Sequence, residues 1–235
     1  MALLYGCSVQ GSYHEINQDA SLLWQQSDLC ALVVADGLGS RPQSAYGAQA
    51  LCAVVREMAE HEAFLWGDMP ATAARIHENW LRRLRDLQIA PHDAYTTCLV
   101  ALLRDHTAYV FRLGDGFIGM RADGVTRLSF DAKEEHFLNE TDCLSERFAP
   151  ACWSLDTWAY GSLDGLILCT DGVDIFCEGC SQRESYARFV ESFVEAYAGK
   201  DMDVLEAEVP VWLRAWRSAD DRTLVCLIKE GRLGK

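Results

Sequence analysis

The stretch from Thr97 to Phe130 limits the fold more than any other part of the sequence, because strand-like runs follow one another there with only short turns between them. The runs are Thr97–Leu103, Ala108–Leu113, Phe117–Arg121 and Val125–Phe130. Parallel strands need a crossover of roughly a dozen residues or more, so strands this close in sequence must pair antiparallel. The turn Ala122-Asp123-Gly124 is typical of a β-hairpin. The sequence therefore requires an antiparallel sheet.

Two pairs of helical segments flank these strands. Apolar residues recur at helical spacing over 44–60, from Pro70 to Leu87, from Tyr186 to Tyr197, and over 204–216, which Pro210 starts or interrupts. Further strand-like runs are Leu3–Val9, Ala20–Trp24, Leu29–Ala35, Leu163–Thr170 and Leu224–Ile228. Each helix pair needs a sheet face to cover. We therefore predict a mixed α/β (α+β) fold, an α-β-β-α sandwich of two antiparallel sheets flanked by helix pairs, with residues 1–235 as one domain.

Residues 131–160 fit neither pattern. They are polar and irregular, with scattered aromatic side chains, and they lie between two strand-like runs. We predict that they form a surface excursion, which could act as a flap that selects substrates.

The charge of the chain narrows the classes of partner. Its 35 acidic and 21 basic side chains give a formal net charge of −14, which argues against binding to nucleic acid or to an anionic membrane surface. No apolar run approaches the ~18 residues of a membrane span. The first residues have neither the basic nor the apolar region of a signal peptide. We expect a cytoplasmic protein, and its oligomeric state stays open.

The ten cysteines do not suggest a disulfide framework, because the chain shows no signal peptide. Only Cys177 and Cys180 have the spacing of metal ligands, and there is no second Cys-x-x-Cys pair to complete a zinc site. A turn containing Gly179 is the favoured interpretation of this segment, and a metal or redox role for the two thiols is the alternative.

Aspartates stand at the ends of several strand-like runs. Asp36 and Asp171 each follow a nearly continuous apolar run, and Asp115 follows Arg112-Leu-Gly114. Asp19 precedes one run, and the pair Asp220-Asp221 precedes the last.

Two other Asp-Gly pairs, at 123–124 and 164–165, are interpreted as ordinary turns. Carboxylates gathered at one rim of a sandwich would repel each other unless a cation lay among them. Oxygen ligands of this kind suit Mg²⁺ or Mn²⁺.

Six short motifs in order give this pattern a family resemblance. They are His14-x-x-Asn-Gln-Asp19, Val33-Val-Ala-Asp-Gly-Leu-Gly39, Tyr95-Thr-Thr97, Gly114-Asp-Gly116, Cys169-Thr-Asp-Gly172 and Asp220-Asp-Arg-Thr223. The set resembles the metal-dependent serine/threonine protein phosphatases of type 2C, and most of all their short bacterial branch, which also shows a motif like Asn139-Glu-Thr141. The resemblance spans residues 6–228 and implies the same sandwich fold.

The resemblance implies a hydrolase that removes phosphate from phosphoserine and phosphothreonine in proteins, with a hydroxide held at a centre of two Mn²⁺ or Mg²⁺ ions. In that case Asp36 bridges the metals, and the Gly37 carbonyl is a neighbouring ligand. Asp171 and Asp220 are then the other carboxylate ligands of one of the two metals. Asp115 then corresponds to a third, weaker metal site, Asp19 to an acid that contacts metal-bound water, and Asp221 to a position next to the ligands.

Two positions depart from the family pattern. His14 stands where an arginine commonly binds the substrate phosphate, and Gln18 stands where a glutamate commonly binds the second metal. His14 remains a candidate for phosphate binding and for protonating the leaving group, for which metal-bound water is an equal candidate, and Gln18 remains a candidate metal ligand. Arg41 is either a second contact to the substrate phosphate or a solvated cation at a helix start.

These departures keep other functions open. One alternative is a catalytically weak or inactive phosphatase-like module that binds a phosphoprotein or a regulatory partner. Another is a metal phosphoesterase that acts on a small phosphate ester. The physiological substrate and the opposing kinase are not encoded in any motif.

Overall fold

The computed structural model describes residues 2–131 and 141–230. Its strands are β1 (Ala2–Val9), β2 (Ala20–Gln26), β3 (Leu29–Ala35), β4 (Cys98–Arg104), β5 (Thr107–Leu113), β6 (Phe117–Ala122), β7 (Val125–Phe130), β8 (Ser154–Ala159), β9 (Leu163–Cys169) and β10 (Arg222–Lys229). Its helices are α1 (Ser44–Glu60), α2 (Met69–Asp86), α3 (Gln182–Tyr197) and α4 (Met202–Ala215). Single 3₁₀ turns lie at Pro91–Asp93 and Pro150–Cys152.

The strands form two antiparallel sheets. Within the described residues one sheet has the order β1-β10-β9-β6-β7 and the other has the order β2-β3-β4-β5-β8. Two of the predicted pairings are confirmed, with Cys98 opposite Leu113 and Phe117 opposite Phe130. The pairing predicted between β5 and β6 is wrong, because the short turn between them carries the chain from one sheet to the other. Asp123 and Gly124 have φ values of 52° and 74°, the left-handed conformation that a two-residue hairpin turn requires.

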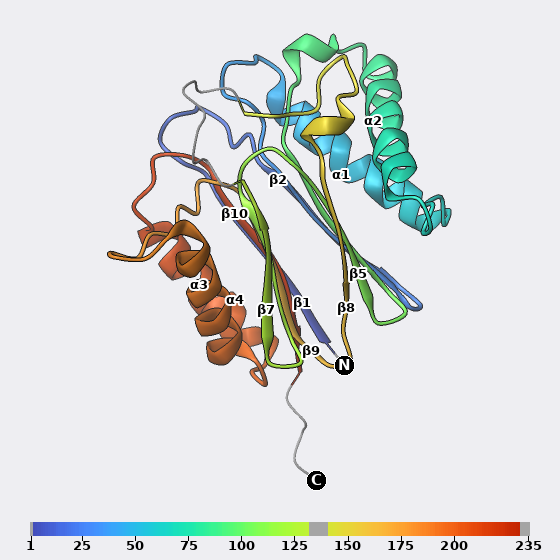
Figure 1. Ribbon diagram of the computed structural model, residues 1–235. Helices are drawn as coiled ribbons and strands as arrows, with labels where there is room; N and C mark the ends of the chain where they lie inside the picture. Colours follow the sequence, from blue (N-terminus) through green and yellow to red (C-terminus); the bar gives the residue numbers. More distant parts are fainter. Residues whose placement is uncertain (1, 132–140, 231–235) are drawn as a thin grey trace.

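Helices cover the outer face of each sheet, so the layers run α-β-β-α (Figure 1). The side chains of β3 point alternately to the two faces of its sheet, and both faces are covered. Ala31, Val33 and Ala35 pack with α1 and α2, whereas Leu32 and Val34 face the other sheet and join a core with β6, β9 and β10. All seven residues of β3 are buried, as expected for a central strand covered on both faces. This architecture confirms the predicted fold class.

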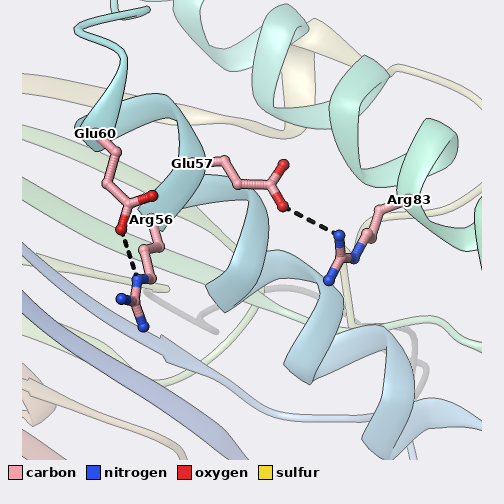
Figure 2. A network of polar contacts seen from close by, with 4 residues as sticks. All are labelled: Arg56, Glu57, Glu60 and Arg83. Atoms are coloured by element: carbon pink, nitrogen blue, oxygen red, sulfur yellow. Dashed lines mark hydrogen bonds and ion pairs between the residues drawn. The ribbon is translucent and has the colours of Figure 1, made fainter.

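Charged side chains link the exposed surfaces of α1 and α2 (Figure 2). Glu57 on α1 pairs with Arg83 on α2 at 3.0 Å, and Arg56 pairs with Glu60 one turn along α1 at 2.8 Å. Such exposed pairs contribute at most about 1 kcal/mol each. Trp80 is fully buried between the helices and donates a hydrogen bond from its indole to the Gly47 carbonyl. Burial of apolar surface therefore holds this helix pair together more than its surface charges do.

Helix α3 lies unusually close to its sheet because two strand positions are glycine. A Cβ at Gly119 would lie 2.4 Å from Cγ2 of Val190, and one at Gly165 would lie 2.6 Å from Cγ2 of Val194. Val190 and Val194 are one helical turn apart and face the sheet together. The prediction of a turn at 164–165 is wrong, because Asp164 and Gly165 lie inside β9 and the glycine serves helix packing.

The predicted excursion at 131–160 is wrong in part. Residues 154–159 form β8, which pairs with β5 at the edge of a sheet. Leu155 packs with the α1–α2 side and Trp158 with the core between the sheets, so β8 carries one apolar anchor on each face and lacks the alternation that marks a strand. Residues 132–140 lie outside the described residues, and with them the Asn139-Glu140 part of the motif.

The connections that carry the aspartates meet at one end of the sandwich. Antiparallel pairing places the ends of β3, β5 and β9 beside the starts of β2 and β10, at the upper end in Figure 1. None of the helices in the described part of the chain has the length and apolar character that crossing a bilayer requires.

Candidate metal and phosphate site

Three carboxylates meet where the two sheets end. Asp36 follows β3, Asp115 lies in the turn between β5 and β6, and Asp171 follows β9. One carboxylate oxygen from each lies within 4.8 Å of the other two, the one such group of three or more potential metal ligands among the described residues. The sequence predicted all three as metal ligands, with Asp115 in a weaker, third site. Here Asp115 joins the central cluster.

The backbone of Asp36 is fixed by the neighbouring strand. Its amide donates to the hydroxyl of Thr97 at 2.9 Å, and its carbonyl accepts from the Thr97 amide and from the Thr96 hydroxyl, each at 2.8 Å. Gly37 follows, and a Cβ at that position would lie 2.7 Å from the backbone of Ser44. Glycine at 37 therefore lets the chain turn tightly out of β3 while the Asp36 side chain remains in the cluster.

Asp36 sits in an environment that opposes its negative charge. Burial is the main cause that raises its pKa well above the ordinary range, and the charges of Asp19, Asp171, Asp115 and Asp220 raise it further. Asp220 thus acts on Asp36 electrostatically, although it is not part of the group of three. A divalent cation among these oxygens would remove the repulsion.

Two buried oxygens beside the cluster lack protein partners. Asp19 Oδ1 and Gln18 Oε1 are both buried, and neither accepts a hydrogen bond from any residue that the structure describes. The other carboxylate oxygen of Asp19 accepts from the Thr170 hydroxyl at 2.9 Å. Burial and the charge of Asp221 raise the pKa of Asp19 to about 7, although hydrogen bonds from the Thr223 and Thr170 hydroxyls act in the opposite direction. Such unpaired oxygens are expected where water or a cation belongs.

Asp221 shapes the loop that carries Gln18. Its side chain is buried and accepts hydrogen bonds from the backbone amides of Gly11 and Gln18, both at 2.7 Å. The neighbouring Arg222 donates to the carbonyls of Gln10 and Trp216 at 3.1 Å each. Asp221 and Arg222, at the entry to β10, thus hold the 10–19 loop in place.

His14 packs against Gly39, three residues after Asp36, because Gly39 has no side chain. A Cβ at position 39 would lie 2.7 Å from Nε2 of His14 and 3.6 Å from Oε1 of Gln18. The Gly37 amide also donates to the Gln18 carbonyl at 3.2 Å. The 10–19 loop and the segment after Asp36 therefore pack directly on each other. His14 and Gln18 lie against Gly37 and Gly39 as a result.

One cavity contains residues of the cluster, and a second cavity lies next to it. One, of about 440 Å³, is lined by Asp115, Asp171, Asp220 and Tyr13, among others. The other, of about 460 Å³, contains Arg41 and the segment that starts at Thr141. The Thr141 hydroxyl donates to Asp115 at 2.8 Å, so the cavities adjoin at this hydrogen bond. Arg41 lines the second cavity and not the one that contains the aspartates.

The threonines at 141 and 170 were missed as supports of the site. Both stand inside the motifs that gave the resemblance, but their hydroxyl partners come from distant segments and leave no local signal.

Cys177 and Cys180 form the turn that the sequence favoured, with the Cys180 amide bonded to the Cys177 carbonyl and φ of 77° at Gly179. Among the described residues no further potential ligand joins the two thiols in a metal-sized group.

Comparisons with known proteins agree with this geometry. The sequence matches the family described as Protein phosphatase 2C over residues 11–214. None of the curated proteins compared with the chain matches it.

Solved structures share the fold at low sequence identity. A serine/threonine phosphatase of S. agalactiae has a TM-score of 0.66 and 14% identity, with 98% of this chain and 100% of that chain covered. A bacterial serine phosphatase has a TM-score of 0.67 and 16% identity, with coverage of 98% and 99%. The catalytic domain of the phosphatase PstP, solved with two manganese ions, has a TM-score of 0.63 and 17% identity, with 97% of both chains covered.

The family match covers most of the chain, and the two antiparallel sheets with their flanking helix pairs are shared with these phosphatases. Both findings confirm the resemblance inferred from the six motifs. The chain belongs to the protein phosphatase 2C family.

Proposed function

We propose that this protein hydrolyses phosphoserine and phosphothreonine in proteins and that it depends on Mn²⁺ or Mg²⁺. The observation that carries the proposal is the convergence of Asp36, Asp115 and Asp171 from three strand ends, with carboxylate oxygens within 4.8 Å. The family match and the manganese ions in the PstP structure support the choice of metal and reaction. The cytoplasm is the compartment we expect.

The donor set fits hard divalent cations. It consists of carboxylate oxygens, the carbonyl of Gly37 and the unpartnered amide oxygen of Gln18, and Mg²⁺ and Mn²⁺ prefer such ligands. We propose Asp36, Gly37, Asp171, Asp220, Asp115 and Gln18 as the residues that hold two metals and a weaker third. Bound there, the metals would lower the pKa of water and neutralise phosphoryl oxygens.

The chain's own side chains have distinct tasks. We propose that Asp19 takes a proton from the attacking water; its Oδ1 is buried and accepts no hydrogen bond from the described residues, while its other oxygen accepts from Thr170, which supports this role. We propose that His14, which packs in the space that Gly39 leaves, donates a hydrogen bond to the substrate phosphate or the leaving oxygen. A histidine makes one such bond at a time, whereas an arginine makes two.

A second function is favoured by His14 and Gln18 themselves. A single-point phosphate contact and a neutral amide ligand both weaken the site relative to an arginine and a carboxylate. A phosphatase-like module that binds a phosphoprotein or a regulatory partner without turnover would retain the fold and one metal.

Phosphate release from a phosphothreonine peptide, with and without Mn²⁺, separates these functions. The enzyme should release phosphate only with Mn²⁺, Asp36→Asn should abolish release, and calorimetry should show two Mn²⁺ per chain. One bound Mn²⁺ with no turnover would favour the binding module. Turnover without added metal after chelation would contradict the proposal. A parallel set of small phosphate esters would reveal a phosphoesterase that is not specific for proteins.

A further inference from the structure

The cavity around Arg41 is not explained by hydrolysis of a phosphate at the metals. It has a volume of about 460 Å³ and is lined by Ser40, Arg41, Thr141, Ser145 and Arg147 as well as by apolar groups. The hydrogen bond from Thr141 to Asp115 marks its border with the carboxylate cluster. Chain segments on either side of a phosphorylated residue at the cluster would therefore extend into this cavity or past it.

Arg41 stacks on Tyr95 at the wall of this cavity. Its guanidinium lies over the ring of Tyr95, 4.4 Å from the ring centre, and the Tyr95 hydroxyl is bonded to Glu146. The Nε atom of Arg41 is buried, and no residue in the described part of the chain accepts a hydrogen bond from it. An arginine fixed by stacking and left with an unsatisfied buried donor is prepared for an anionic ligand, because a charged acceptor satisfies it best.

The charges in the cavity favour an anion as well. Arg41 and Arg147 contribute two guanidinium groups, and Asp142 contributes one carboxylate. The lining therefore carries one more positive than negative side chain, and the Glu146 carboxylate, which is bonded to Tyr95, also acts on Arg41. The Ser40 hydroxyl adds a neutral polar group, whereas the hydroxyls of Thr141 and Ser145 already donate to Asp115 and to the Arg147 carbonyl.

We propose that the Arg41 cavity binds a second anionic side chain of the substrate, close in sequence to the phosphorylated residue, and so selects phosphoproteins with acidic or doubly phosphorylated sites. This inference rests on the proposed function and adds the substrate class. A carboxylate and a phosphate share the chemistry that Arg41 recognises, and both are compatible with the volume. The scissile phosphate itself belongs at the carboxylate cluster, on the other side of Thr141.

The test compares three sets of peptides that carry the same phosphothreonine. Each set places one residue at every position within three of the phosphothreonine: glutamine, glutamate, or a phosphonate analogue of phosphoserine that cannot be hydrolysed. We measure kcat/KM with Mn²⁺ for the wild type, Arg41→Gln and Arg41→Lys. Arg85→Gln is the matched control, because it removes one positive charge from an exposed position of α2 outside this cavity.

At least one position should favour the anionic peptides by roughly tenfold over glutamine, the effect of one charge-assisted hydrogen bond. That ratio should fall to near one in Arg41→Gln, fall in part in Arg41→Lys, and persist in Arg85→Gln. Whether glutamate or the phosphonate gives the larger ratio identifies the natural anion.

Three outcomes would overturn the inference alone: equal rates for all sets in the wild type, a ratio that persists in Arg41→Gln, or an equal loss for every peptide in that variant. The last would mean that Arg41 binds the scissile phosphate. Absence of Mn²⁺-dependent hydrolysis of any peptide would refute the proposed function and this inference with it.

Discussion

Replacing Asp36 by Asn should stabilise the metal-free protein, although it should destroy the activity. Asp36, Asp115 and Asp171 present carboxylate oxygens within 4.8 Å of one another. Two unit charges at that distance, with an effective dielectric constant of about 20, repel by on the order of 3 kcal/mol. Asp36 takes part in two of the three pairs, and partial protonation relieves some of the repulsion. We therefore expect a net gain of about 3 kcal/mol in the free energy of unfolding, or roughly 6–12 °C in Tm.

Thermal and urea unfolding at neutral pH measure this gain after chelation of metals. Asp123→Asn is the control, since Asp123 also ends a strand but accepts hydrogen bonds from the amides of Gly161 and Ser162. That variant should lose stability, both with and without metal. With saturating Mn²⁺ the order of wild type and Asp36→Asn should reverse, because a ligand that binds the folded state stabilises it.

The pH dependence has the same cause. Burial raises the pKa of Asp36 and of Asp19, in the latter to about 7. A carboxyl group whose pKa is raised by folding binds its proton more tightly in the folded state, so its contribution to stability is lost as the pH rises. The metal-free wild type should lose stability between about pH 4 and pH 7. Asp36→Asn should lose less over that range.

A metal-free Asp36→Asn that is less stable than the wild type would refute this reasoning. Such a result would mean that the Asp36 carboxylate makes a favourable contact within the protein. Repulsion among the three carboxylates would then not be the dominant effect.

Other changes test single contacts of the site. Asp221→Asn should lower the free energy of unfolding by about 2 kcal/mol, because the Gly11 and Gln18 amides donate to different carboxylate oxygens and asparagine has only one acceptor oxygen, so one N–H would face an NH₂ group. Urea unfolding checks this, and an unchanged midpoint would contradict the bracing role of Asp221. Gln18→Glu should tighten Mn²⁺ binding in calorimetry, because it supplies the anionic oxygen that a hard cation prefers; weaker binding would show that Gln18 is not a ligand. Gly39→Ala should raise KM for a phosphopeptide more than it changes Mn²⁺ affinity, because its Cβ would displace the His14 ring; equal effects on both would argue against a phosphate role for His14.

The layers of the fold follow from local patterns. The short turns after β4 and β6 give antiparallel hairpins, and the fully apolar β3 requires cover on both faces. The equally short turn after β5 instead crosses to the other sheet, which its length alone does not reveal. β8 could not be predicted in this way, since its two apolar anchors, Leu155 and Trp158, face different cores. Gly165 was misinterpreted because a turn and a close helix approach use the same residue for different reasons, and only the packing of Val194 distinguishes them.

Some features of the site could also be predicted from the sequence, and others could not. Aspartates at strand ends could be recognised from sequence, because a carboxylate after a buried run is costly without a function. The partners of these aspartates could not. The bond from Thr170 to Asp19 joins residues 151 positions apart, and the bonds from the 10–19 loop to Asp221 span more than 200. The place of Arg41 in a separate cavity likewise depends on how the 141–153 segment returns across the end of the sandwich.

A crystal structure of the protein grown with Mn²⁺, with anomalous scattering measured at the manganese edge, tests the metal centre most directly. We expect two strong peaks among the oxygens of Asp36, Asp171 and the Gly37 carbonyl, with Asp115, Asp220 and Gln18 at their edges, and loss of both peaks in Asp36→Asn. Absence of manganese between these carboxylates at saturating Mn²⁺ would contradict the proposed metal-dependent phosphatase.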